Sequence, residues 1–264
     1  MTTTDSDDRT TGTDTDESTA TGAYGVVVVG GGVAGLTAGV FTARHGRETL
    51  VVDAGESILR RNAHLENFPG FPAGVNARLL LDMLADQAEA AGCERREATV
   101  TRVATTPEGF TVGTTDGDRY RAEYVVAATK NATDYLDGVE GVGFIDRGKT
   151  FIDTDEHGRT GVDGLYAAGR LAEKPHQAVV CAGHGAEVAV TLLADDDRPF
   201  YHDWVAPEGY FTDRGRDLPP GCEEVRETER RRREEESLAT MREYVAEPHP
   251  DEQLTHPSLR DDGE

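Results

Sequence analysis

The strongest constraint on the fold is a stretch near the N-terminus in which an apolar strand, a glycine-rich turn, a helix and a second strand follow one another. Val26–Val29 is a run of four valines, which is typical of a parallel strand buried on both faces. Gly30–Gly35 follows it directly, and residues 33–43 have the composition of a helix. Thr49–Val52 is a second apolar strand, and it ends at Asp53. This order predicts a β-α-β unit within a parallel sheet.

Each part of the glycine turn has a physical reason. Gly30 permits the tight turn out of the strand, and Gly32 has no Cβ, so that a pyrophosphate can approach the backbone. Gly35 lets the helix pack closely on the sheet. The free N–H groups of Val33 and Ala34 face the phosphate at the positive end of the helix dipole. The motif therefore predicts dinucleotide binding.

An acidic residue at the end of the second strand narrows the choice of dinucleotide. Asp53 lies where a carboxylate accepts hydrogen bonds from the 2′-hydroxyl of an adenosine ribose. Because a carboxylate repels a 2′-phosphate, the sequence favours FAD or NAD over NADP.

The acidic composition indicates the environment of the protein. The 264 residues include 50 acidic and 27 basic side chains, for a net charge of −23, and the acids are spread along the whole chain. This pattern predicts a surface adapted to high salt, in a cytoplasmic and haloarchaeal protein, since salt screens the self-repulsion. An acidic mesophilic protein is the alternative. Such a surface argues against a nucleic-acid partner, which would be repelled.

The cysteines indicate a reduced protein without a metal site. Cys93, Cys181 and Cys222 are far apart and form neither a CxxC pair nor a metal-ligand spacing. The first twenty residues are polar, so no signal peptide is predicted. No segment approaches the ~20 apolar residues that span a bilayer, and no membrane partner is expected.

We expect three parts along the chain: a disordered acidic arm (1–22), an FAD-binding domain (23–194) and a C-terminal extension (195–264). The domain is predicted to be a Rossmann-like α/β fold with a mostly parallel sheet, flanking helices and a small β-meander. Further elements follow from periodicity and turn residues. They are a loop at Ala54–Pro72, a helix at Val75–Gly92, strands within Cys93–Thr129, a strand at Gly164–Gly169, a helix at His176–Ala194 and a charged helix at Glu223–Val245.

Four segments together resemble the FAD domain of thioredoxin reductases and their relatives among flavoproteins with two dinucleotide-binding domains. The segments cover residues 23–193 and appear in the family's order. They are the Gly30–Gly35 turn with Asp53, the ENFPGFP sequence of Glu66–Pro72, the VVAAT sequence of Val125–Thr129, and GLYAAG at Gly164–Gly169 with the later His176–Ala178.

The resemblance implies FAD as the cofactor and assigns roles along it. Asp53 would hold the adenosine ribose, Val100 would contact adenine through its backbone, and Asn67 would approach the flavin. The last helix would direct its N-terminal N–H groups at the flavin, where they stabilise the negative charge of the reduced form. The full set of implied cofactor residues is Gly30, Gly32, Val33, Ala34, Gly35, Asp53, Asn67, Val100, Thr129, Gly169, Arg170, Gln177 and Ala178.

The departures from the family pattern affect the predicted function. Arg170 stands where the family has an aspartate, and this cation can reach the pyrophosphate. Lys130 replaces the glycine of the family's A-T-G, and Ser57–Arg61 replaces a glycine-rich flavin loop. Only thirty residues separate Thr129 from Thr160, where the reductases carry an NADPH domain with the redox CxxC. A domain typically needs 50 residues or more, so both are predicted to be missing.

The favoured function is an FAD-dependent oxidoreductase that resembles thioredoxin reductase, with an unknown donor and acceptor. Electrons would come from a small redox protein, a diffusible donor or a nicotinamide bound transiently. No side chain is identified as a catalytic acid or base. One alternative is a regulatory FAD- or NAD-binding protein, which the cations at positions 130 and 170 favour. Another is a biosynthetic enzyme on the same domain, similar to thiazole synthase.

Weaker candidates have ordinary structural explanations. Cys181 is a candidate redox thiol, but a small buried side chain is favoured. His176 is a candidate at the flavin, but capping or packing is favoured. Tyr201–Trp204 is expected either to cover the site or to form a homodimer contact. Arg230–Arg233 is predicted to be a solvated helix surface with i,i+4 ion pairs.

Overall fold

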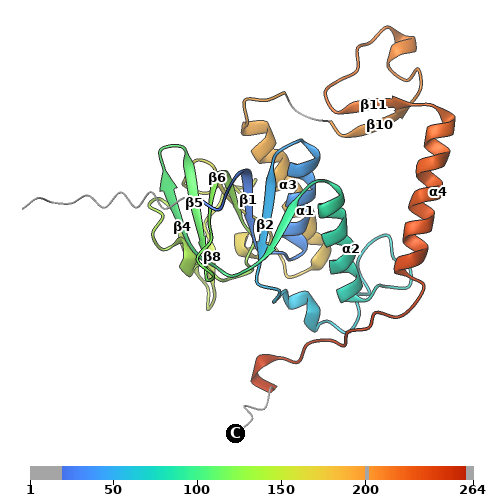
Figure 1. The fold of residues 1–264 in the computed structure, drawn as a ribbon. Coiled ribbons are helices and arrows are strands. Elements are labelled where there is room, and N and C mark those ends of the chain that lie inside the picture. Colours follow the sequence, from blue (N-terminus) through green and yellow to red (C-terminus); the bar gives the residue numbers. More distant parts are fainter. Residues whose placement is uncertain (1–19, 200–201, 260–264) are drawn as a thin grey trace, which may run out of the picture.

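The computed structural model describes residues 20–199 and 202–259, and a seven-stranded, mostly parallel sheet forms its centre (Figure 1). The sheet order is β3-β2-β1-β6-β5-β4, and β9 also pairs with β6. The predicted Rossmann-like α/β fold is confirmed. The strands are β1 (Gly22–Val29), β2 (Thr49–Asp53), β3 (Glu94–Glu97), β4 (Val100–Thr106), β5 (Gly109–Thr114), β6 (Arg119–Ala127) and β9 (Leu165–Ala167).

One long strand, β6, joins the meander to the parallel sheet. Its first half, Arg119–Ala122, pairs antiparallel with β5, and its last residues, Val125–Ala127, pair parallel with β9. Its other edge pairs parallel with β1 from Tyr120 to Ala127. The carboxyl ends of β2, β1, β6 and β9 therefore meet at one edge of the sheet.

The valine run of β1 is buried on both faces, as its composition predicts. Val26 and Val28 belong to the core between the sheet and the helices. Val27 and Val29 point to the opposite face and pack with the meander and the segment between β6 and β9. Successive side chains alternate across a strand, so β1 needs an apolar residue at every position.

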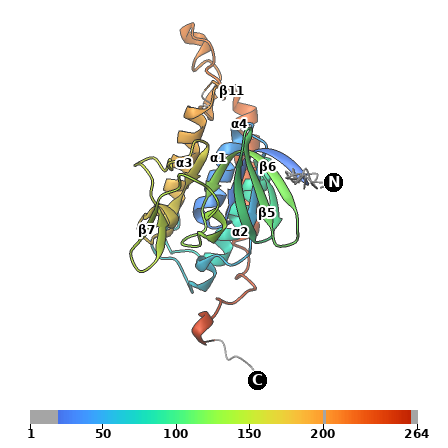
Figure 2. The ribbon, with the colours of Figure 1, turned by 90° about the vertical axis from the view of Figure 1, so that its left-hand side faces the viewer.

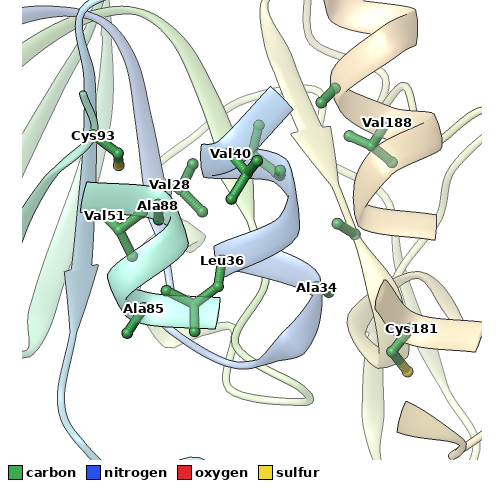
Figure 3. Packing of buried hydrophobic residues seen from close by; sticks show 14 of the residues in the cluster. Val28, Ala34, Leu36, Val40, Val51, Ala85, Ala88, Cys93, Cys181 and Val188 are labelled. Carbon is green, nitrogen blue, oxygen red and sulfur yellow. The ribbon is translucent and has the colours of Figure 1, made fainter. Parts of the chain in front are cut away.

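Three helices cover one face of the sheet: α1 (Val33–Arg44), α2 (Ala77–Ala90) and α3 (Ala178–Asp195). Figure 3 shows α1 between the other two, with Leu36 and Val40 directed into the core. The predicted second helix, Val75–Gly92, begins two residues late. Asn76 caps it instead, because its side chain accepts hydrogen bonds from the N–H groups of Arg78 and Leu79.

The backbones of α3 and α1 are in direct contact at Gly185 and Ala34. A Cβ on Gly185 would lie 2.1 Å from the carbonyl oxygen of Ala34, so only glycine fits there. In length and composition α3 resembles a membrane span, contrary to the expectation from the sequence. Val188, Ala189 and Leu192 are fully buried in the core, which is the environment of a core helix.

Short elements occupy the connections. The predicted loop at Ala54–Pro72 contains a single helical turn, η1 (Ile58–Arg61). Between β6 and β9 lie η2 (Asp134–Leu136) and a hairpin of β7 (Phe144–Asp146) and β8 (Thr150–Ile152), and η3 (Gly169–Ala172) follows β9.

The first part of the C-terminal extension projects beyond the end of the domain, and its long helix runs back beside α2 (Figure 1 and Figure 2). Its elements are β10 (Trp204–Pro207), η4 (Thr212–Arg214), β11 (Cys222–Val225), α4 (Glu227–Tyr244) and η5 (Pro257–Leu259). The prediction of a helix from Glu223 is wrong for its first four residues. They are extended because β11 pairs with β10, and Glu224 accepts hydrogen bonds from the N–H groups of Gly209, Phe211 and Thr212.

Ion pairs and a few tethers hold α4. The predicted i,i+4 pairs are present, for example between Arg232 and Glu236 at 2.9 Å. The hydroxyl of Tyr244 donates to Asp86 of α2 at 2.6 Å, and His249 lies 2.8 Å from Asp82. Of the predicted acidic arm, residues 1–19 lie outside the described residues, and β1 already begins at Gly22.

We predict that Gly185→Ala destabilises the protein by roughly 1–3 kcal/mol, because the new methyl group overpacks the contact between α1 and α3. Gly183→Ala is the matched control in the same helix, since a Cβ there meets nothing within 4 Å. The control should stabilise by roughly 0.5–1 kcal/mol through helix propensity. Urea unfolding of both variants measures the difference, and equal stabilities would contradict the packing argument.

Candidate functional site

A pocket of about 1020 Å³ lies at the edge of the sheet where the parallel strands end. Its walls come from the ends of β1, β2 and β6, the N-termini of α1 and α3, and η1. Ligands of doubly wound α/β folds bind at this edge, where the loops after the strands can separate. The pocket is therefore the candidate site.

The structure brings most of the predicted cofactor residues together in this pocket. Gly35 and Gly169 are the two that do not line it. The predicted residues that line it are Gly30, Gly32, Val33, Ala34, Asp53, Asn67, Val100, Thr129, Arg170, Gln177 and Ala178.

The two exceptions shape the pocket from behind. Gly35 packs against the turn, where a Cβ would lie 1.9 Å from the carbonyl oxygen of Gly30. Gly169 has a φ of 66°, and a Cβ there would lie 2.7 Å from the Cβ of Ala34. Sequence reasoning missed Gly31. A Cβ on this residue would lie 2.5 Å from a carboxylate oxygen of Asp53, so glycine leaves the room that the Asp53 side chain needs.

Both helices that begin at the pocket leave their N-terminal N–H groups available. The N-cap residues Gly32 of α1 and Gln177 of α3 make no side-chain capping bond, and neither first turn contains an acidic residue. A Cβ on Gly32 would meet only the Ser57 hydroxyl at 3.7 Å, so the space before α1 is open. Free N–H groups and the helix dipole favour an anion there, so the residues fit a dinucleotide diphosphate.

The end of the pocket predicted to hold the adenosine lies where β2 meets β3. The carbonyl oxygen of Asp53 accepts a hydrogen bond from the N–H of Ala98 at 3.0 Å. Ala98, Thr99 and Val100 line the pocket beside it. Ala98 and Thr99 were not predicted, although they directly precede the predicted Val100.

At the other end of the pocket, the ENFPG segment meets the start of α3. The Asn67 amide nitrogen donates to the Gln177 amide oxygen at 2.8 Å. These two residues are 110 positions apart, and both are implied at the flavin by the family resemblance. Their contact joins the two segments that would hold that end of the cofactor.

Cys181 lies at this end but does not have the environment of a reactive thiol. It is buried, its Sγ is 3.5 Å from the carbonyl oxygen of Pro175, and burial raises the pKa of the thiol. A thiolate is the reactive form, so the surroundings favour a packing role.

The aromatic segment after α3 lies away from the pocket. Asp203 accepts hydrogen bonds from Arg44, at the end of α1 opposite the pocket. None of His202–Trp204 lines the pocket, so the expectation that these residues cover the site is wrong. Tyr201 lies outside the described residues. The alternative, a homodimer contact, stays a prediction.

Lys130 adopts a left-handed backbone conformation at the edge of the pocket. Its φ is 67°, a region that favours glycine, and glycine is the residue of the family motif at this position. The preceding Thr129 holds the turn, since its hydroxyl donates to the Ala132 carbonyl at 2.6 Å and lies 3.0 Å from the Tyr135 hydroxyl. The lysine therefore carries a conformational cost at a position that lines the pocket.

We predict that Lys130→Gly raises the free energy of unfolding by about 1 kcal/mol, because glycine relieves the left-handed strain. Lys130→Asn should recover part of this gain, since asparagine tolerates the same conformation. Lys130→Ala is the control that removes the cation and keeps the strain. Thermal melting measures all three, and a glycine variant no more stable than the alanine variant would contradict the strain argument.

His184 fixes the turn that carries Gly169 and Arg170. Its Nδ1 accepts a hydrogen bond from the Gly169 N–H at 2.9 Å, and the side chain is buried in α3. Burial lowers the pKa of His184 from 6.5 to about 4, so the ring stays neutral at neutral pH. A neutral Nδ1 is required, because a protonated one cannot accept this hydrogen bond.

We predict that His184 makes stability depend on pH. Because the folded pKa lies below the unfolded one, protonation favours unfolding, and the free energy of unfolding should fall by about 3 kcal/mol from pH 7 to pH 4. His184→Asn keeps a hydrogen-bond acceptor for the Gly169 N–H but has no group that titrates in this range. Its free energy of unfolding should therefore lose this part of the pH dependence. Urea unfolding at several pH values compares the two proteins, and identical pH profiles would contradict the assignment.

The sequence matches the family model described as pyridine nucleotide-disulphide oxidoreductase over residues 26–185, more than half of the chain. The chain belongs to this family, whose members are FAD-binding oxidoreductases. The prediction of FAD as the cofactor and the resemblance to the thioredoxin reductase type are thereby confirmed at the level of the family.

Curated relatives support the same family over part of their length. A thioredoxin reductase of Aquifex aeolicus is 32% identical over 108 residues, which cover 40% of this chain and 33% of the relative. A thioredoxin reductase of Streptomyces coelicolor is 37% identical over 108 residues, which cover 39% of this chain and 33% of the relative. The chain thus spans about a third of the length of these relatives.

Solved structures share the fold. A thioredoxin reductase from Gloeobacter violaceus superposes with a TM-score of 0.62 at 18% identity, covering 69% of this chain and 98% of the other. The thioredoxin reductase of T. acidophilum superposes with a TM-score of 0.54 at 18% identity, and the match covers 66% of this chain and 98% of the other. At this identity the likeness concerns the fold alone.

Proposed function

We propose that this chain is an FAD-dependent oxidoreductase that works with one FAD-binding domain, residues 23–194. The observation that carries the proposal is that one pocket is lined by Asp53 and by the N-termini of α1 and α3, neither of which has a side-chain cap. This arrangement suits a ligand with a diphosphate in the middle, a ribose at one end and a ring that accepts negative charge at the other.

The chain's own residues would bind, orient and stabilise charge. The N–H groups at the start of α1 hold the diphosphate, and the Asp53 carboxylate accepts from the ribose hydroxyls. The start of α3, positioned by the hydrogen bond between Gln177 and Asn67, presents N–H groups to the ring end. FAD, when bound, supplies two-electron redox chemistry. The dipole of α3 favours the reduced, negatively charged state.

The reductant would come from outside the chain. Residues 130–159 form η2 and the β7–β8 hairpin between β6 and β9, and the sequence has no CxxC pair. We therefore propose neither a second dinucleotide domain nor a redox dithiol within this chain. The donor would be a diffusible molecule, a small redox protein or a transiently bound nicotinamide, in a salt-adapted cytoplasmic protein.

The first test is the visible spectrum of the protein purified in molar KCl, before and after NADH and NADPH are added. We expect a yellow protein with flavin absorption. Bleaching by a nicotinamide would identify that nucleotide as a donor, and a protein that stays yellow would favour another donor or the regulatory alternative. A colourless protein that takes up no FAD would refute the proposal. The melting temperature of the same sample should fall at low salt.

A pair of glycine variants makes this test specific to the site. Gly32→Ala should fold normally and bind FAD more weakly, because its methyl group enters the open space before α1. Gly138→Ala is the matched control, since a Cβ there meets nothing within 4 Å and the residue does not line the pocket. Equal FAD affinities in the two variants would place the cofactor elsewhere.

A further inference from the structure

Four cations lie at or beside the pocket, and we call them the cation cluster: Arg61, Lys130, Lys149 and Arg170. They come from four separate segments, namely η1, the turn after β6, the turn between β7 and β8, and η3. Arg61, Lys130 and Arg170 line the pocket, and the exposed Lys149 lies close enough to Lys130 for its charge to lower the Lys130 pKa. Lys149 and Lys130 are two of only three lysines in the chain.

The cation cluster is not neutralised within the described part of the chain. Among residues 20–199 and 202–259, no carboxylate forms an ion pair with any of the four, although the chain has 50 acidic and 27 basic residues. Arg170 is held by other contacts. It donates to the Lys174 carbonyl at 3.1 Å, and its guanidinium lies 4.7 Å from the centre of the Phe151 ring.

The cations also act on one another and on the start of α3. Burial lowers the pKa of Lys130, and Lys149, Arg61 and Arg170 lower it further. Burial also lowers the pKa of His176. The positive charges of Lys130, Arg170 and Lys149 lower it further. His176 directly precedes the N-cap of α3, so the positive field reaches the end of the pocket assigned to the flavin.

The cofactor alone does not account for this charge. A dinucleotide diphosphate carries about two negative charges, one for each phosphate. The N-terminus of α1 already offers about half a positive charge to it. Four clustered cations therefore leave an excess of positive charge beside the bound cofactor, and an additional anion would relieve their mutual repulsion.

We propose that the cation cluster binds the phosphate or carboxylate groups of a small anionic co-substrate that reacts at the flavin end of the pocket. The proposal rests on the proposed function and names the substrate class of that site. Arg61, Lys130 and Arg170 would contact the anionic group from the pocket wall, and Lys149 would contact it from the rim.

A small anion fits this site better than an acidic protein does. Three of the four cations line a concave pocket, which a folded partner enters poorly. The chain carries a net charge of −23, so an acidic protein would meet repulsion over its whole contact surface. A small anion meets only the local positive field, since salt screens the more distant charges.

Isothermal titration calorimetry on the FAD-loaded protein tests the proposal, at the lowest KCl concentration in which circular dichroism reports the folded state. Inorganic pyrophosphate and citrate are the probes for phosphate-bearing and carboxylate-bearing ligands. We expect at least one to bind, and Lys149→Glu to weaken it by about tenfold, as expected for losing a close charge contact. Arg121→Glu is the matched control, an exposed residue in the first half of β6.

Three results would overturn the proposal. Probes that bind the FAD-free protein but not the loaded one would mean that the cluster serves only the cofactor's own phosphates. Equal weakening by Lys149→Glu and Arg121→Glu would reveal a general effect of charge. No binding of either probe would exclude the site. The yellow colour of the loaded protein separates each of these from a failure of the proposed function, in which FAD itself does not bind.

Discussion

The backbone contact between α1 and α3 is the constraint on which the site depends. Gly185 allows the two helices to touch, and Gly169 allows the turn before α3 to pack on the first turn of α1. Both helix N-termini consequently open onto one pocket, which the ends of β1 and β2 also line. Larger side chains at these glycines would separate the two positive helix ends, and one extended ligand would no longer reach both.

The pocket departs from its family pattern mainly in charge. A cation stands at position 130, where the backbone conformation suits glycine, and another at position 170, where the family has an acid. Each substitution has a structural support. Thr129 and Tyr135 hold the strained turn, while Phe151 and the Lys174 carbonyl orient Arg170. Neither cation has an ion-pair partner among residues 20–199 and 202–259, and this lack of neutralising charge is the basis of the proposed anionic ligand.

Local sequence signals predicted most of the fold. They failed where a contact with a residue distant in the sequence determines the local structure or the position of a segment. The β-α-β unit, the meander and the three core helices follow from periodicity and glycine spacing. The start of α4 does not, because Glu224 has high helix propensity but accepts hydrogen bonds from the N–H groups of a loop twelve to fifteen residues earlier. His202–Trp204 likewise looked suited to covering a pocket, yet Asp203 anchors them to the far end of α1.

The sequence by itself determined the fold class and the family, and it predicted residues that the structure brings together in one pocket. Glycine spacing, strand composition and the acid after the second strand are local patterns, and local sterics and hydrogen bonding account for them. Only the tertiary structure decided that Asn67 meets Gln177 and that Arg61, Lys130, Lys149 and Arg170 form one cluster. These contacts join segments far apart in the chain, and the packing of α1 between the sheet, α2 and α3 brings them together.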